Sequence, residues 1–322
     1  MPHAEFSDMP IVAPGASVVV VGGANTDVVG VSAHALVARD SNPGSIRTSP
    51  GGVGRNVAEN LVRLGVGVEF VTAFGDDDAG RALRASCRVR GIGTATSLVA
   101  ADLPGAHYLA VLDERHDMAV AINDMRVLDR LTPEVLAEPE RAQLLLAADL
   151  VVVDANLPAE TLEWLAVAVR APILLEPVSA AKTCRASGIL ARLAALTPNT
   201  LEAAALLGHD VSGIDEAQRA ACELVALGAG SAFVTYGAAG VAWADANGSG
   251  VVEAPVVEVA NASGAGDAFC AGVAYALLAR GGARTAAKLG TVLAGFALAD
   301  EDTVSRSITY RAVSEAMKES RP

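Results

Sequence analysis

The stretch NASGAGDAF, residues 261–269, sets a run of small residues before a single carboxylate and then enters an Ala-rich apolar segment. Small residues at a helix start let an anion approach the free backbone N–H groups, where the helix dipole adds partial positive charge. We therefore expect an anion hole formed by Gly264, Ala265 and Gly266.

The carboxylate of this stretch, Asp267, should be ionised at neutral pH, because a free aspartate has a pKa of about 3.9. Beside an anion, such a charge is unfavourable unless it has a task. One task is to accept a proton from a hydroxyl group that attacks phosphorus. The alternative is a helix cap that only complements the dipole, and this stretch alone leaves both open.

Composition limits the class of protein. The chain has 322 residues, 52% hydrophobic and 19% charged, which is typical of a globular protein. A formal net charge of −13 without a basic stripe argues against a nucleic-acid polymer as partner. The N-terminal segment MPHAEFSDMP lacks the pattern of a secretory signal, and no apolar run reaches the ~18 residues of a membrane span. We expect a cytoplasmic protein with no membrane partner.

Cysteine and histidine usage indicates no metal centre of the transition-metal type. The four cysteines are scattered and form no CxxC, so we expect buried free thiols. The five histidines have no metal-ligand spacing.

Strand and helix patterns alternate along most of the chain. The expected strands are 17–21, 68–72, 150–153, 173–175 and 232–235. The expected helices are 57–64, 81–89, 158–169, 201–207, 286–299 and the one that starts at the opening motif. Two hairpins are expected, 108–112 with 118–122 and 241–244 with 251–259.

This alternation predicts an α/β fold with a central, mostly parallel sheet and helices on both faces, as one domain over residues 1–322. Segments at approximately 30–48 and 105–125 do not fit that sheet. We expect them to form a small β-sheet lid over the carboxyl ends of the strands, where ligands bind in such folds. Neither a Walker P-loop nor a G-x-G-x-x-G dinucleotide fingerprint is present.

Five motifs occur in the order of a known family. NASGAGDAFCAGVAYA (261–276) and GGVGRNVAENLVRLG (51–65) resemble the two signatures of the PfkB-type (ribokinase-like) sugar and nucleoside kinases. NTLE (199–202), GGANTD (22–27) and TYGAAG (235–240) are similar to its N-x-x-E motif, first sugar-binding strand end and nucleotide-binding turn. The resemblance implies a ribokinase-like fold, ATP and Mg²⁺ as cofactors, and a homodimer formed through the lid.

Three further segments resemble the pseudouridine kinases of that family, namely 38–56, AINDM (121–125) and EPVSAAK (176–182). This implies ATP-dependent phosphorylation of the pseudouridine 5′-hydroxyl. A ribokinase or another nucleoside kinase is an alternative. A non-catalytic nucleoside-binding module is another, although a pure binder has no use for Asp267 as a base.

The resemblance also implies a substrate site. Asp27, with Asn25, would hold ribose hydroxyls, or else form only an Asx-turn. The other residues expected there are Gly51, Gly52, Gly54 and Asn56, the last of which could equally be an N-cap. For the base, Ser41, Asn42 and Asn123 in the lid segments offer donors and acceptors, or else only shape the turns.

For the nucleotide and its metal ions, the expected residues are Asn199, Glu202, Thr235, Gly237, Gly240 and Lys182. Glu202 would act on Mg²⁺ largely through water, since Mg²⁺ retains several waters. Asn261 and Ser263 stand where many members bind a monovalent cation, so K⁺ is possible. Asn261 replaces the usual aspartate, and Glu176 also departs from the aspartate often found at its position.

Overall fold

The computed structural model describes residues 9–319, so the first eight residues of the N-terminal segment lie outside it. A central sheet of eight strands runs in the order β14-β13-β12-β11-β10-β9-β1-β4. Its strands are β1 (Ser17–Val21), β4 (Gly67–Val71), β9 (Leu150–Asp154), β10 (Ile173–Glu176), β11 (Ala195–Leu196), β12 (Ser231–Thr235), β13 (Val241–Asp245) and β14 (Gly248–Val252). The six strands from β4 to β12 are parallel, and β13 and β14 form an antiparallel edge.

Helices cover both faces of this sheet because its strands are apolar on both sides. One core lies under α1 (Val53–Arg63), α2 (Asp78–Val89), α9 (Ala265–Leu278), α10 (Ala283–Leu298) and α11 (Tyr310–Glu319). The other lies under α3 (Pro133–Leu136), α4 (Pro139–Ala147), α5 (Ala159–Ala168), α7 (Thr200–Leu207) and α8 (Ile214–Ala226). Alternate residues of β1 belong to different cores, with Val18 and Val20 in the first and Val19 and Val21 in the second.

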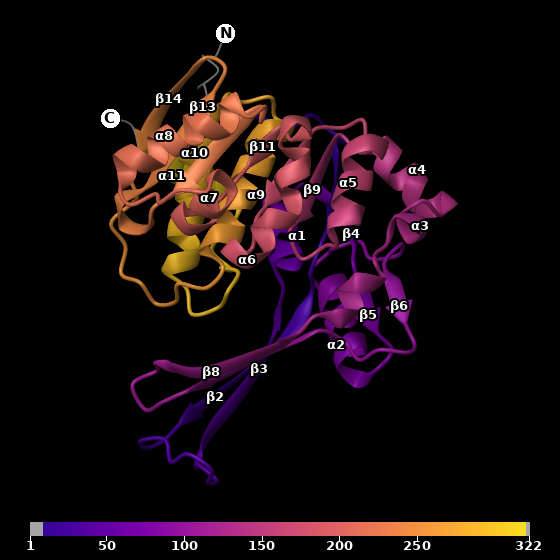
Figure 1. Cartoon of the computed structure of the whole chain (residues 1–322), viewed down its shortest axis with the longest axis vertical. Coiled ribbons are helices and arrows are strands. Elements are labelled where there is room, and N and C mark those ends of the chain that lie inside the picture. Colours follow the sequence, from indigo (N-terminus) through magenta and orange to yellow (C-terminus); the bar gives the residue numbers. More distant parts are fainter. Residues whose placement is uncertain (1–8, 320–322) are drawn as a thin grey trace.

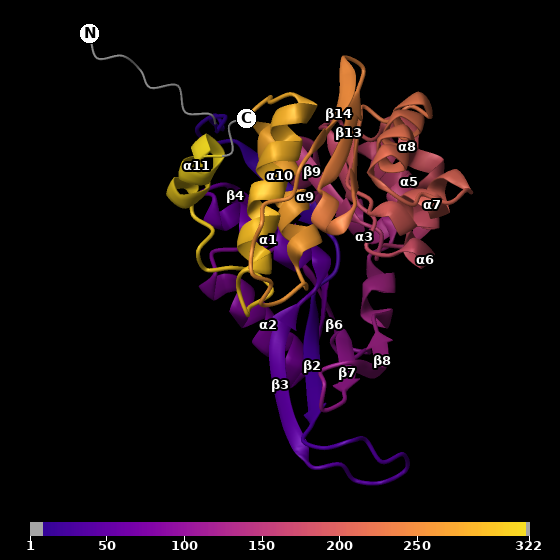
Figure 2. The same cartoon turned by 90° about the vertical axis from the view of Figure 1, so that its left-hand side faces the viewer.

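A second sheet projects from this body (Figures 1 and 2). Its order is β3-β2-β7-β8, and its strands are β2 (Asn25–Ser32), β3 (Gly44–Gly51), β7 (His107–Leu112) and β8 (Met118–Asp124). The segments expected to form a small β-sheet lie in these strands and their turns. We call it the lid sheet. The strands β5 (Ala73–Gly75) and β6 (Leu98–Ala100) pair separately at its base.

The remaining elements are short. They are α6 (Ala180–Thr183) and the 3₁₀ segments η1 (Arg126–Arg130), η2 (Cys184–Arg192) and η3 (Gly237–Ala239). No helix among residues 9–319 is long and apolar enough to cross a membrane.

The predicted α/β architecture is confirmed, with two local corrections. The partner of β13 was expected at 251–259 but is Gly248–Val252. The Asp245 carboxylate accepts the N–H groups of Asn247 and Gly248, at 2.8 and 3.1 Å, and this tight turn sets the register. The expectation of buried thiols is wrong for Cys184 and Cys222, which are exposed, whereas Cys87 and Cys270 are buried.

Candidate active site

A cleft of about 1060 Å³ lies between the lid sheet and the body. It opens at the carboxyl ends of β1 and β9. Here the chain runs from β1 to β4 on one side and then from β4 to β9 on the other side of β1. Open α/β sheets bind ligands at such switch points. The carboxylate of Asp154, at the end of β9, accepts N–H groups of Gly23 (2.7 Å) and Gly54 (2.9 Å), and so ties the turn after β1 to the start of α1.

The carboxylate of Asp267 lies at the floor of this cleft, in the first turn of α9. Asn56 on α1 donates its side-chain N–H to Asp267 Oδ2 at 2.6 Å. Burial raises the pKa of Asp267 to about 6, although the Asn56 hydrogen bond and the charge of Arg55 oppose the rise. The group can therefore exist both as carboxylate and as acid near neutral pH, which suits proton transfer.

The N-terminus of α9 faces the same cleft. Gly264 is its N-cap in the left-handed region, with φ of 84°, and a Cβ there would lie 2.1 Å from the Thr303 carbonyl oxygen. Only glycine fits this position without displacing the loop after α10. A Cβ on Gly266 would meet nothing within 4 Å, so the first turn of α9 is open to a ligand. This arrangement is a suitable anion-binding geometry.

The substrate-side residues come together on one face of the lid sheet. Asn25, Asp27 and Asn123 line the cleft, together with Tyr108, which pairs with both Asp27 and Asn123 across neighbouring strands. Asn25 donates to Asp27 Oδ1 at 2.6 Å, and burial raises the pKa of Asp27 despite that bond. A Cβ on Gly51 would lie 2.2 Å from the Asp27 carboxylate, so any other residue here would displace that carboxylate.

Gly52, Asn56 and Asp267 also line the cleft, whereas Gly54 packs beneath it against Phe70 and Asp154. Ser41 and Asn42 do not line it. They lie in the turn between β2 and β3, where Asn42 accepts from Val37 N and donates to the carbonyl groups of Val37 and Asp40.

Apart from Lys182, the nucleotide-side residues gather at the neighbouring strand ends, outside the cleft lining. Asn199 bridges to Thr235 at the end of β12. The turn that contains Gly237 and Gly240 follows directly and closes with a hydrogen bond from Tyr236 N to Gly240 O at 2.8 Å. Lys182 lines the cleft, and its ammonium group donates to Asn156 Oδ1 at 2.6 Å.

Asn199 and Glu202 form a reciprocal capping box on α7. Glu202 is buried near Glu176, which accepts a hydrogen bond from Thr197 at 2.6 Å. Burial, followed by repulsion from Glu202, raises the pKa of Glu176 well above its usual range, and burial also raises the pKa of Glu202. Two buried carboxylates with raised pKa values fit a hydrated Mg²⁺ ion, which needs few protein ligands.

A monovalent cation fits the contacts of Asn261 less well than Mg²⁺ fits the two glutamates. Its side-chain oxygen accepts Ser263 N at 2.9 Å, and its amide N–H donates to the Glu301 carbonyl oxygen at 3.0 Å. The oxygen and the N–H group of this amide thus both have protein partners, and the amide brings no negative charge. Within residues 9–319, no group of three or more His, Cys, Asp or Glu side chains is arranged to hold a metal ion.

Comparison with known proteins gives the family. Residues 16–309 match the pfkB family of carbohydrate kinases. The chain belongs to this family. It is 37% identical over 259 residues to a pseudouridine kinase of Escherichia coli K12, covering 80% of this chain and 82% of that one. A carbohydrate kinase from Agrobacterium tumefaciens superimposes with a TM-score of 0.85 at 28% identity, over 95% of this chain and 98% of the other.

The fold is shared more widely. A ribokinase of Arabidopsis thaliana solved with ribose and ATP has a TM-score of 0.81 at 20% identity, over 96% of this chain and 99% of that chain. This pfkB kinase is therefore a ribokinase-like phosphotransferase that acts on an alcohol group of a sugar or nucleoside. That assignment excludes the alternative of a non-catalytic binding module.

Sequence reasoning missed several cleft residues of the pfkB kinase. Tyr108, Met118 and His116 line the lid side, and Asn156 lines the body. The signal for Tyr108 was its alternation with Ala110 and Leu112, which places all three on the cleft face of β7. Asp154, the last residue of β9, is an acid at the carboxyl end of a parallel strand, and the rule that ligands bind at such ends could have identified it.

Proposed function

We propose that the protein transfers the γ-phosphoryl group of ATP to the 5′-hydroxyl of pseudouridine, giving pseudouridine 5′-phosphate and ADP. The observation that carries the proposal is the position of Asp267. It stands between the open N-terminus of α9 and a polar lid face with Asp27 and Asn123. The 37% identity to a pseudouridine kinase favours this nucleoside over ribose or other nucleosides.

In the proposed mechanism, Asp27 and Asn25 hold the ribose hydroxyls, and Asp267 takes the proton of the 5′-hydroxyl. That oxygen attacks the γ-phosphorus in line while the bond to the bridging oxygen breaks and ADP leaves. Backbone N–H groups of Gly264, Ala265 and Gly266 stabilise the charge that develops on the transferred group.

ATP would lie toward the strand ends that carry the capping box of α7 and the turn at 237–240, with Lys182 near its phosphates. Glu202, with Glu176 nearby, would hold hydrated Mg²⁺, which neutralises phosphate charge when bound. For K⁺, the contacts of Asn261 favour a cation-independent enzyme over a cation-activated one.

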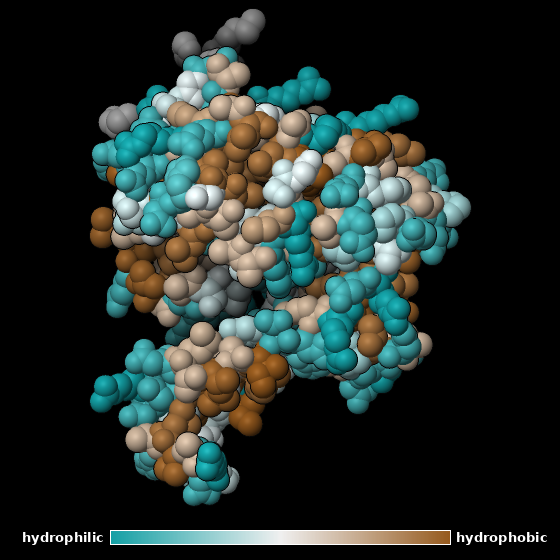
Figure 3. Space-filling view, in the orientation of Figure 1, coloured by the Kyte–Doolittle hydropathy of each residue, from teal (hydrophilic) through white to brown (hydrophobic). Residues whose placement is uncertain are grey.

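We further propose that the lid sheet closes over the nucleoside and that two copies associate through its outer face. The molecule is hollowed between the lid sheet and the body (Figure 3). Closing this space would exclude water and so limit wasteful hydrolysis of ATP.

A substrate panel tests the proposed function. ADP release is measured with ATP and each of pseudouridine, uridine, cytidine, adenosine and ribose, and kcat/KM should be highest for pseudouridine. A higher kcat/KM for ribose or another nucleoside would show that pseudouridine is not the preferred substrate, while the phosphoryl-transfer reaction would stand. Omitting Mg²⁺ should abolish turnover, whereas exchanging K⁺ for Na⁺ should change it little.

A further inference from the structure

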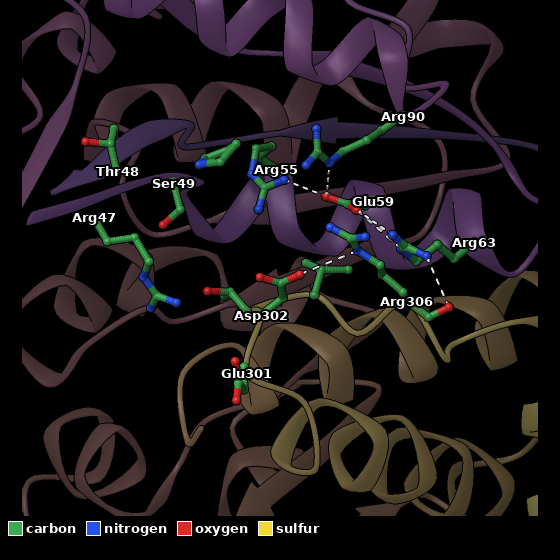
Figure 4. A pocket seen from close by; sticks show the side chains of 13 residues that line it. Arg47, Thr48, Ser49, Arg55, Glu59, Arg63, Arg90, Glu301, Asp302 and Arg306 are labelled. Carbon is green, nitrogen blue, oxygen red and sulfur yellow. Dashed lines mark hydrogen bonds and ion pairs between the residues drawn. The ribbon is translucent and has the colours of Figure 1, made fainter. Parts of the chain in front are cut away.

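A second cavity adjoins the transfer site along β3 and is drawn in Figure 4. Its volume is about 270 Å³. We call it the arginine pocket, after the five arginines that line it, Arg47, Arg55, Arg63, Arg90 and Arg306. Three carboxylates also line it, those of Glu59, Glu301 and Asp302. Five positive charges against three negative ones leave a local excess of two, in a chain with a net charge of −13.

Glu59 takes up part of this positive charge. It is buried on α1, and Arg63 reaches its Oε1 at 3.0 Å, whereas Arg55 and Arg90 reach its Oε2 at 2.6 and 3.0 Å. A buried carboxylate needs one compensating charge, and here three guanidinium groups surround it. Neutralising Glu59 therefore does not account for the whole cluster.

The two remaining arginines have hydrogen-bond donors to spare. Arg306 makes one long ion pair, from its Nε to Asp302 at 3.5 Å, and its side chain is 82% exposed. The side chain of Arg47 is exposed and makes no hydrogen bond or ion pair with any residue that the structure describes. Arg306 extends toward Glu59 and Arg63 from the loop after α10, and Arg47 comes from β3 on another side (Figure 4).

We propose that the arginine pocket binds a small phosphate-bearing dianion, in addition to the ATP and nucleoside of the proposed function. Guanidinium groups arriving from β3, α1, the end of α2 and the loop after α10 suit a tetrahedral oxyanion, because each planar fork can reach a different oxygen pair. The volume lies just below the range of about 300–1,000 Å³ of sites for drug-sized ligands and suits a phosphate group with a small substituent.

The arginine pocket is one side chain away from the base of the proposed reaction. Arg55 donates to Gly51 O at 3.0 Å and to the side-chain oxygen of Asn56, which in turn donates to Asp267 at 2.6 Å. A dianion beside Arg55 would therefore make the electrostatic potential at Asp267 more negative. The pocket also shares Arg47, Ser49, Glu301 and Thr303 with the cleft, so an occupant would contact the base of the lid sheet.

Calorimetric titration tests the proposal without nucleoside or ATP, and so independently of turnover. Inorganic phosphate and glycerol phosphate are titrated at constant ionic strength into the wild type, and chloride serves as the blank. The wild type should bind at least one of them. Tighter binding of glycerol phosphate would identify a phosphate ester as the source, and equal or tighter binding of inorganic phosphate would identify the free ion.

Pocket variants separate this site from the N-terminus of α9, which also attracts phosphate. The double variant Arg63→Gln/Arg306→Gln should weaken binding about tenfold or more, because hydrogen bonds to charged groups are lost. Arg306→Gln alone should weaken it in the same direction with the ion pairs of Glu59 intact. The control Arg311→Gln removes an equal charge on α11, where Arg311 pairs with Glu315 outside the arginine pocket.

Two results would overturn the proposal. One is the absence of binding to the wild type by either phosphate compound. The other is unchanged affinity in both pocket variants, which would assign the anion to the cleft. Melting temperatures measured with and without ligand show whether each variant is folded, and a ligand-induced rise in the wild type that Arg306→Gln loses and Arg311→Gln retains would support the pocket.

Discussion

At the scale of single residues, opposing effects act on Asp267. Burial raises its pKa to about 6, and the hydrogen bond from Asn56 lowers it. Because a general base must be ionised, kcat/KM for the nucleoside should be constant well above pH 6 and fall about tenfold per pH unit below it. A profile that stays flat down to pH 5 would contradict this.

Asn56→Ala should move the acid limb of that profile to higher pH, because it removes the bond that stabilises the carboxylate. Its effect on kcat/KM should be larger at pH 6 than at pH 8. Asn60→Ala is the control on the same helix, since Asn60 donates to the Asn56 carbonyl and makes no hydrogen bond with Asp267. If the pH profile of Asn56→Ala has the same inflection as that of the wild type, the Asn56 amide does not control the pKa of Asp267.

Asn123 is predicted to read the base. Pseudouridine joins uracil to ribose through carbon, which leaves a ring N–H that uridine lacks. A site that hydrogen-bonds this group discriminates better than an apolar pocket can. Asn123→Ala should narrow the kcat/KM ratio of pseudouridine to uridine and leave the KM of ATP unchanged. Asn42→Ala, in the turn outside the cleft, should leave both as they are, and an equal effect of the two variants would exclude Asn123 as the reader.

The sequence anticipated individual residues unevenly. Asp267, Asn56, Asp27 and Asn123 line one cleft, and their roles toward the substrate stay predictions. The arginine cluster around Glu59 was not foreseen. Arg55 and Arg63 look like ordinary i,i+4 partners on a helix surface, and Arg47, Arg90 and Arg306 are far away in sequence. Arg55, in the first signature, could from the sequence either reach a phosphate or be a solvated surface residue, and the structure buries it at 2% exposure.

At the scale of elements, close contact between α9 and α10 holds the first turn of α9 in place. A Cβ on Gly272 would lie 2.6 Å from the Cα of Gly290. Gly272→Ala should therefore lower the free energy of unfolding by about 1–3 kcal/mol, the usual effect of overpacking. Urea unfolding measures it. Gly188→Ala, whose Cβ would only touch Glu163 at 3.7 Å, is the control and should change stability little. Equal stabilities would mean that the helices can separate without penalty.

Element prediction succeeded where periodicity was strong and failed where the pattern was ambiguous. The buried strand β1 has the bounds that its β-branched run predicts. The strands β2 and β3 were seen only as an insertion, because β3 is exposed for most of its length and has no apolar alternation. The helices α8 and α11 were not predicted, although α8 has a buried face of alanines and Leu224.

At the scale of the whole molecule, the outer face of the lid sheet carries exposed apolar side chains. Ile46, Val120 and Ile122 are 79%, 53% and 62% exposed, and they point away from the cleft by strand alternation. Exposed apolar patches of this kind mark interaction sites, and a second copy presents the same face. Light scattering should therefore give the mass of a dimer.

Ile46→Glu/Ile122→Glu should shift that mass toward the monomer, because four charges would have to be buried in a symmetric interface. Val256→Glu adds a charge at a fully exposed loop position and should leave the mass unchanged. A dimer that survives the double variant would place the interface elsewhere. The sequence alone could not have identified these residues, because their exposure depends on which face of the lid sheet covers the cleft.

The central claim is that Asp267 removes the proton of the attacking hydroxyl, and the most direct test compares kcat and nucleoside affinity in Asp267→Asn. The account predicts that kcat falls about 10²–10⁴-fold, the usual loss of a general base, while the dissociation constant of pseudouridine stays nearly the same. Asp215→Asn, at an exposed position of α8, should match the wild type in both. A kcat of Asp267→Asn close to that of the wild type would contradict the account.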